Sequence, residues 1–131
     1  MSTTIKVRGY HLDVYQHVNN ARYLEFLEEA RWALFEDGQL LRIFAEKNLG
    51  FAVVNINISF RRAAVMGDVL DIRTEFAGFG EKSSVLKQTI FIAGTEKVVA
   101  EADVTYVILD LNTNRAIVLD DDLRTLLSSA S

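Results

Sequence analysis

Apolar side chains recur at helical spacing between residues 20 and 37. They occupy positions i, i+4, i+7 and i+11 counted from Tyr23, and further apolar residues widen this stripe. Asn19 or Asn20 can cap the start of such a helix, and Gly38 follows its end. Because the apolar surface is so broad, the pattern predicts a helix that is largely surrounded by protein.

Beyond residue 50 the pattern changes to an alternation of apolar and polar residues, which is typical of strands with one buried face. Four such strands are predicted, over residues 55–60, 70–76, 86–92 and 98–108. A short strand is expected over residues 5–8, helices over residues 40–47 and 120–127, and turns at Gly78/Gly80, Gly94-Thr95 and residues 112–114. No linker or repeat interrupts the chain, so residues 1–131 are interpreted as one domain.

This order of elements predicts an antiparallel α+β fold, because strands that follow one another directly pair with their neighbours. A single long helix must then bury its apolar stripe against that sheet. A highly curved sheet wrapped around one central helix meets both demands. Val99, Val107 and Leu109 fall on the opposite face of the sheet, which predicts burial against a second copy of the chain.

Composition narrows the class of protein. The chain has 131 residues, 50% hydrophobic and 24% charged, as expected for one folded core. It has no cysteine and only two histidines, His11 and His17, so we expect no metal and no other cofactor. A net charge of −4 argues against nucleic-acid binding. No apolar run is long enough to cross a bilayer, and residues 1–6 lack the core of a signal peptide, so a cytoplasmic protein without membrane contact is expected.

The segment just before the long helix carries the candidate chemistry. It contains Asp13, Tyr15, His17, Asn19 and Asn20 within eight positions. Backbone N–H groups at a helix start can hold a developing oxyanion, and a carboxylate four residues before a histidine can orient it, activate water or attack directly. The structural alternatives are a helix cap, a turn-forming aspartate, a packed tyrosine and a histidine with a structural role.

The run Leu12-Asp-Val-Tyr-Gln-His-Val-Asn-Asn-Ala-Arg-Tyr-Leu-Glu-Phe26 resembles the signature of hotdog-fold acyl thioesterases of the 4-hydroxybenzoyl-CoA thioesterase-like superfamily. The similarity continues through residues 28–31, 53–62 and 67–68, and so covers essentially the whole chain. It is greatest to the bacterial long-chain acyl-CoA thioesterase III type. The His-Val-Asn-Asn element also resembles the plant acyl-acyl-carrier-protein thioesterases. The resemblance implies the hotdog fold, in which a curved, five-stranded antiparallel sheet surrounds one central helix.

The resemblance also implies a role for individual residues. Asp13 aligns with the catalytic carboxylate, which acts as a general base toward water or as a nucleophile through an anhydride, and both descriptions stay open. His17 matches a histidine that assists water activation, whereas Tyr15 stands where the plant motif has asparagine. The remaining candidates are backbone N–H groups near Val18, Asn19 and Asn20 for the oxyanion hole, Tyr23, Phe26, Leu27 and Ala30 for the acyl slot, and Arg61, Arg62, Lys82, Ser83 and Ser84 for coenzyme A phosphates.

For the acyl-slot residues the alternative is ordinary core, and for the coenzyme A residues it is a solvated strand end. We interpret the chain as a thioesterase that hydrolyses medium- or long-chain acyl-CoA at a site shared between subunits of a homodimer or homotetramer. Two alternatives remain, hydrolysis of acyl-carrier-protein thioesters and a non-catalytic acyl-CoA sensor. The acidic net charge disfavours an acidic carrier protein, and a sensor has no need for Asp13 and His17 together.

Overall fold

The computed structural model describes residues 1–129. Its elements, in chain order, are β1 (Ser2–Lys6), the 3-10 turn η1 (Gly9–His11), α1 (Asn20–Asp37), α2 (Leu40–Lys47), β2 (Leu49–Phe60), β3 (Val69–Phe79), β4 (Ser83–Ile92), β5 (Val98–Asp110), β6 (Arg115–Ala116) and α3 (Asp121–Ser128). Every predicted helix and strand has a counterpart, although β1 spans Ser2–Lys6 rather than the predicted residues 5–8. Strand β2 is longer than its alternation indicated, because it begins at Leu49 rather than at residue 55.

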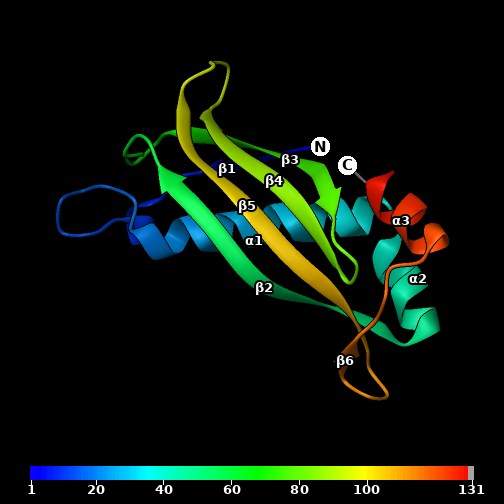
Figure 1. Ribbon diagram of the computed structural model, residues 1–131. Helices are drawn as coiled ribbons and strands as arrows, with labels where there is room; N and C mark the ends of the chain where they lie inside the picture. Colours follow the sequence, from blue (N-terminus) through cyan, green and yellow to red (C-terminus); the bar gives the residue numbers. More distant parts are fainter. Residues whose placement is uncertain (130–131) are drawn as a thin grey trace.

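The strands form one antiparallel sheet in the order β1-β3-β4-β5-β2, and the two-residue β6 pairs with β5. Figure 1 shows this curved sheet with α1 lying across one of its faces. Helices α2 and α3 lie near one end of α1, and the loop that precedes α1 projects beyond the other end. The predicted α+β hotdog architecture, with a curved five-stranded antiparallel sheet around one helix, is confirmed.

Helix α1 begins at its predicted cap. The Asn19 side-chain oxygen accepts a hydrogen bond from the Ala21 N–H at 2.9 Å, which satisfies one of the free donors of the first turn. One face of the helix is buried against the sheet, but Leu24 and Trp32 on the other side are 39% and 48% exposed. The prediction of a helix surrounded by protein is therefore wrong for a single chain, which covers only one of its faces.

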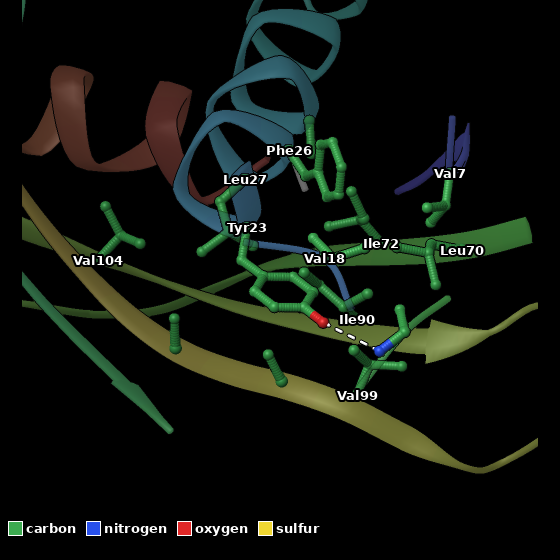
Figure 2. Packing of buried hydrophobic residues seen from close by; sticks show 14 residues of the cluster. Val7, Val18, Tyr23, Phe26, Leu27, Leu70, Ile72, Ile90, Val99 and Val104 are labelled. Atoms are coloured by element: carbon green, nitrogen blue, oxygen red, sulfur yellow. Dashed lines mark hydrogen bonds between the residues drawn. The ribbon is translucent and has the colours of Figure 1, made fainter. Parts of the chain in front are cut away.

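The buried side chains form two clusters along α1. One lies between the first half of α1 and strands β1, β3, β4 and β5, and Figure 2 shows its members, among them Tyr23, Phe26 and Leu27. The other joins the second half of α1 to α2, α3 and the far end of the sheet. Residues 7–18 thus leave the sheet at the end opposite to α2 and α3.

Register shifts interrupt three of the strand pairs, and two of these shifts bear on predicted positions. Ile90 pairs with Ala100 and Phe91 with Val98, so Val99 is an extra residue in β5. Val99 is consequently buried in the core, and its prediction as an outward-facing residue is wrong. A second shift between Phe76 and Gly78 places Gly78 inside β3 rather than in a turn.

Candidate active site

The loop between η1 and α1 is closed by its own backbone. Leu12 and Val18 form an isolated antiparallel bridge, and the Asp13 N–H donates to the His17 carbonyl at 2.8 Å. The Gln16 N–H donates to the Asp13 carbonyl at 3.1 Å, and Gln16 has a positive φ of 64°, which is uncommon for a residue other than glycine. The loop is therefore a compact turn built around Asp13.

The Asp13 carboxylate is held by backbone N–H groups. Its Oδ1 accepts hydrogen bonds from Tyr15 N at 2.8 Å and from His17 N at 3.4 Å. Within residues 1–129, Oδ2 has no hydrogen-bond partner. One oxygen thus fixes the position of the half-buried carboxylate, and the other remains able to accept a proton or to attack.

A cavity of about 270 Å³ lies against this carboxylate. It is lined by Asp13, His17, Val18, Asn20, Tyr23, Phe60, Arg61, Arg62 and Ala63. The structure therefore brings together the predicted carboxylate, histidine, helix start and arginine pair, although about 40 residues separate the two parts of the chain. Phe60 and Ala63 were not predicted; their only signal was that they flank the arginine pair.

His17 and Tyr15 differ in their relation to this cavity. The His17 side chain is exposed and lines it, but within the described residues no hydrogen bond joins its imidazole to Asp13. Tyr15 is 77% exposed and is not among the lining residues. It contributes its backbone N–H to Asp13, so nothing in the structure places its phenol at the site.

The three candidate oxyanion donors are not equivalent. The Val18 N–H donates to Ala64 O and the Asn19 N–H to His11 O, each at 2.9 Å, so both are occupied. Asn20 is the first residue of α1, and its N–H has no acceptor in the part of the chain that the structure describes. The candidate oxyanion donor is therefore narrowed to Asn20.

Arg61 and Arg62 line the same cavity but differ in charge pairing. Arg61 forms an ion pair with Glu101 at 2.6 Å and holds the pKa of that carboxyl below its ordinary value. Arg62 has no ion pair with any residue from 1 to 129. Both backbone N–H groups donate to the carbonyl of the bulged Val99, at 2.8 and 3.1 Å, which fixes the arginine pair to β5.

The other predicted coenzyme A residues lie at the far end of the sheet. Strand β3 begins at Val69, close to residues 7–18, and extends for about 33 Å to Phe79. Lys82, Ser83 and Ser84 follow its far end. Ser84 is fully buried. Within one chain none of these three residues lines the Asp13 cavity.

The four predicted acyl-slot residues are all buried in the core under α1, with exposures from 0 to 5%. Only Tyr23 also lines the Asp13 cavity. Its hydroxyl oxygen accepts a hydrogen bond from the Ala64 N–H at 3.1 Å, drawn as the dashed line in Figure 2. Burial raises the pKa of Tyr23, and the charges of Asp68 and Asp13 act in the same direction. That the four buried residues of this paragraph hold an acyl chain stays a prediction.

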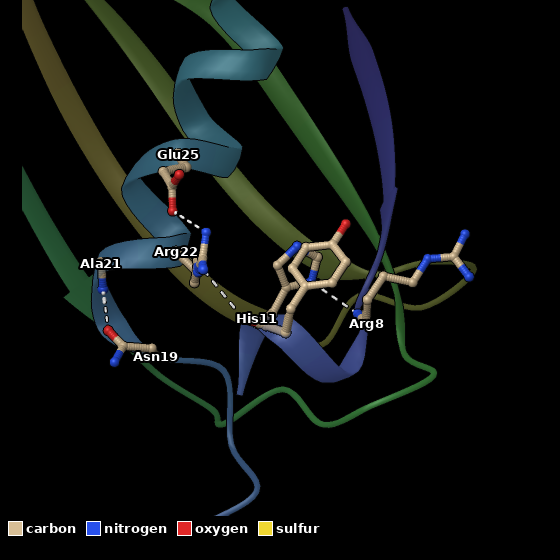
Figure 3. Close-up of polar contacts among 7 residues, drawn as sticks. Arg8, His11, Asn19, Ala21, Arg22 and Glu25 are labelled. Atoms are coloured by element: carbon tan, nitrogen blue, oxygen red, sulfur yellow. Dashed lines mark hydrogen bonds and ion pairs between the residues drawn. The ribbon is translucent and has the colours of Figure 1, made fainter. Parts of the chain in front are cut away.

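His11 holds the start of α1 in place through hydrogen bonds, a role that the sequence did not indicate. Its Nδ1 accepts the Arg8 N–H at 2.9 Å, as Figure 3 shows. Its carbonyl accepts the Asn19 N–H, so His11 connects the exit of β1 to the helix start. It is buried, with Phe26 packed at its edge. Burial lowers its pKa, and the charge of Arg22 adds to the effect.

Two features are absent from residues 1–129. No group of three or more His, Asp or Glu side chains is close enough to hold a metal ion. None of the helices there is both long and apolar enough to span a bilayer.

A curled antiparallel sheet packed on one helix, with a backbone-held carboxylate at the helix start, defines a hotdog-fold protein of the thioesterase class. Residues 7–127 match the Thioesterase-like superfamily. The chain therefore belongs to this superfamily, as its resemblance in residues 12–26 indicated.

Individual relatives agree with this family. The chain is 52% identical, over 124 residues, to the long-chain acyl-CoA thioesterase FadM of Escherichia coli (strain K12), covering 95% of this chain and 94% of FadM. The structure of YbaW, a probable thioesterase from Escherichia coli, has a TM-score of 0.95 at 50% identity and covers 99% of this chain and 98% of that chain. The structure of SAV2348 from Staphylococcus aureus, solved in complex with CoA, has a TM-score of 0.83 at 15% identity and covers 98% of this chain and 82% of that chain. At this identity the similarity supports the fold but not the function.

Proposed function

We propose that this protein hydrolyses medium- or long-chain acyl-CoA to a free fatty acid and coenzyme A. The observation that carries the proposal is the Asp13 carboxylate, held on Oδ1 by two backbone N–H groups with Oδ2 free beside a cavity. The 52% identity to a long-chain acyl-CoA thioesterase supports the choice of substrate.

In this proposal Asp13 acts as a general base or as a nucleophile. As a base, it takes a proton from water while the water oxygen attacks the thioester carbon; the C–S bond then breaks, and the coenzyme A thiolate leaves and takes up the proton. As a nucleophile, it displaces the thiolate to form an anhydride, which water then cleaves. In both cases the Asn20 N–H at the helix start stabilises the oxyanion, and His17 orients the water.

The arginine pair supports a position for coenzyme A. Arg62, exposed and without an ion pair in residues 1–129, is available to a phosphate, whereas Arg61 would first have to leave Glu101. We therefore assign the first phosphate contact to Arg62. Lys82, Ser83 and Ser84 belong to this site only if a second subunit supplies them.

We further propose that the active form is a homodimer joined through β2. This strand is an edge of the sheet, and its Val54 and Phe60 are 59% and 46% exposed, as is Leu24 of α1 at 39%. An exposed apolar edge strand is a template for pairing with another strand. Two copies related by a two-fold axis would pair β2 with β2 in antiparallel orientation.

Substitution of Asp13 tests the function directly. Because the chain contains no cysteine, a thiol reagent detects only released coenzyme A, so palmitoyl-CoA hydrolysis can be followed without background. Asp13→Asn is expected to lower kcat by about 10²-fold or more with KM nearly unchanged, since the base or nucleophile is lost and binding groups remain.

Asp37→Asn is the matched control, because Asp37 is exposed at the end of α1 and distant from the cavity. It should keep wild-type turnover. Wild-type turnover in Asp13→Asn would contradict the role of Asp13. Tight binding of acyl-CoA by the wild type without any thiol release would instead identify a sensor, and hydrolysis of acyl-carrier-protein thioesters alone would change the substrate class.

A further inference from the structure

A positive charge is buried beneath the second half of α1, away from the candidate active site. Arg31 is 8% exposed, and its Nη1 donates to Gln88 Oε1 at 3.2 Å. The Gln88 amide in turn donates to Leu27 O and Thr74 Oγ1, each at 3.0 Å, so Gln88 is held in place. This polar network lies inside an otherwise apolar core.

The Arg31 guanidinium is left largely without partners. It has five N–H donors, and the bond to Gln88 is the one it makes with residues 1–129. No carboxylate of these residues lies within 4.0 Å of it. Burial lowers the pKa of Arg31, whereas the charge of Glu28 acts in the opposite direction. A buried cation without a counter-ion is unfavourable, because its hydration is lost and not replaced.

Arg31 forms part of the wall of a cavity of about 330 Å³ between α1, α2 and β2. The other lining residues are Glu28, Trp32, Phe35, Leu41, Phe51 and Val53. Phe35 and Phe51 stack at 4.3 Å between ring centroids. The cavity shares no residue with the Asp13 cavity, and Arg31 lies eleven positions beyond Asn20, about 16 Å along the helix.

We propose that this cavity binds a long-chain fatty acid, with the carboxylate on Arg31 and the hydrocarbon chain against the aromatic wall. A carboxylate matches the fork of N–H donors in a guanidinium and supplies the missing negative charge. The apolar lining matches the chain, and the volume lies within the range of ligand pockets, about 300–1,000 Å³. The choice of ligand rests on the proposed function, because a fatty acid is the product of acyl-CoA hydrolysis.

The charge of Glu28 should weaken fatty-acid binding in this cavity. Its carboxylate is exposed, lines the same cavity and accepts a hydrogen bond from Trp32 Nε1 at 3.3 Å. A fixed negative charge beside Arg31 weakens the binding of another carboxylate. Glu28→Gln removes this charge but keeps an acceptor for Trp32, so it should tighten fatty-acid binding severalfold.

Trp32 provides the measurement, because it is the one tryptophan in the chain and lines this cavity. A dibrominated stearic acid bound there should quench tryptophan fluorescence by contact. The Asp13→Asn variant serves as the host protein, so that hydrolysis plays no part in the titration. The methyl ester of the same dibrominated acid, which has no negative charge, is expected to bind at least about tenfold more weakly than the acid.

Arg31→Met keeps the length of the side chain and should weaken binding of the acid about tenfold or more, while binding of the methyl ester changes little. Arg31→Lys, which keeps the charge, should retain part of the affinity. Arg42→Met is the matched control, since Arg42 is an exposed residue of neighbouring α2 that pairs with Glu46. It should bind like the host protein.

Three results would overturn the proposal: no quenching, equal affinity for acid and ester, or unchanged affinity in Arg31→Met. If Arg31→Met fails to fold, the comparison of acid with ester and the Glu28→Gln variant still decide the matter. Loss of the proposed hydrolysis in the wild type with quenching intact would refute the proposed function and leave this binding site standing.

Discussion

Asp13 owes its position to the backbone of its own turn rather than to another side chain. Two N–H groups, those of Tyr15 and His17, converge on Oδ1. Both donors belong to the turn of residues 13–17, so the backbone of that turn fixes the orientation of the carboxylate. The proposed chemistry therefore rests on one acid, with a nearby histidine whose imidazole is not hydrogen-bonded to it within residues 1–129.

His11 makes stability depend on pH at the level of a single residue. Burial and the charges of Arg22 and Arg8 lower its pKa from 6.5, against the opposing charge of Glu25. The unfolded chain therefore binds this proton more readily than the folded chain. The stabilising effect of neutral His11 is complete above pH 6.5 and is lost as the pH falls through the lower folded-state value.

We expect the midpoint temperature of thermal unfolding of the wild type to decrease as the pH is lowered from 7.5 to 5.5. His11→Asn should make this decrease smaller, because asparagine offers an acceptor to Arg8 N but does not titrate. Differential scanning calorimetry measures both. The exposed His17 is the natural control, and His17→Asn should keep the wild-type slope. Equal slopes in the wild type and His11→Asn would show that other groups cause the pH dependence.

At the scale of elements, the start of α1 is the junction between fold and site. The Asn19 side chain caps the helix by accepting the Ala21 N–H, and its own N–H is tied to His11 O. This geometry leaves the Asn20 N–H free at the cavity. The cap therefore stabilises the helix and places the candidate oxyanion donor at the same time.

Asn19→Ala is expected to lower the free energy of unfolding by about 1 kcal/mol, within a range of about 0.5–2 kcal/mol for lost caps. Urea unfolding followed by circular dichroism measures the change. Asn19→Ser should restore most of it, because serine also accepts from the second helical N–H. Asn57→Ala, at an exposed position of β2, is the control and should shift stability by less than about 0.5 kcal/mol.

Periodicity predicted the elements well and failed where a strand departs from a strict period of two. The helix over residues 20–37 and its cap follow from local pattern and chemistry, and the structure has both. Val99 does not follow, because one extra residue in β5 turns its side chain into the core. Gly78 is similarly drawn into β3 by a register shift. Such bulges depend on the partner strand, which a local pattern does not contain.

The candidate site was predictable in the segment from Asp13 to Asn20, whose parts are neighbours in sequence. The approach of Arg62 to that segment depends on the turn after β2 and on both arginine N–H groups binding Val99 O, so it required the tertiary structure. The occupied N–H groups of Val18 and Asn19 were also invisible in the sequence, because their acceptors are fixed by folding. The burial of Arg31 also required the tertiary structure, because it depends on the approach of Gln88 in β4.

At the scale of the whole molecule, the two edges of the sheet differ. Strand β1 is a five-residue edge, whereas β2 is a twelve-residue edge with apolar side chains exposed. Short edges resist unwanted pairing, and long apolar ones favour it. A second copy seated on β2 would also cover Leu24 of α1, which the chain itself leaves exposed.

A charge at the centre of this edge should separate the subunits. Val54 is the residue at the β2 register shift and is 59% exposed, so Val54→Lys introduces a cation at the edge without altering the core. Sedimentation velocity at micromolar concentration should show a dimer for the wild type and a monomer for this variant. If the site is shared between subunits, palmitoyl-CoA hydrolysis should fall in parallel with the dimer fraction.

Val118→Lys is the matched control, because Val118 is 54% exposed in the segment between β6 and α3, away from the β2 edge. It should remain a dimer with wild-type activity. A wild-type monomer would contradict the dimer. A monomeric Val54→Lys variant with full activity would support the proposed interface but show that one subunit suffices for catalysis. Lys82, Ser83 and Ser84 would then have no part in binding coenzyme A.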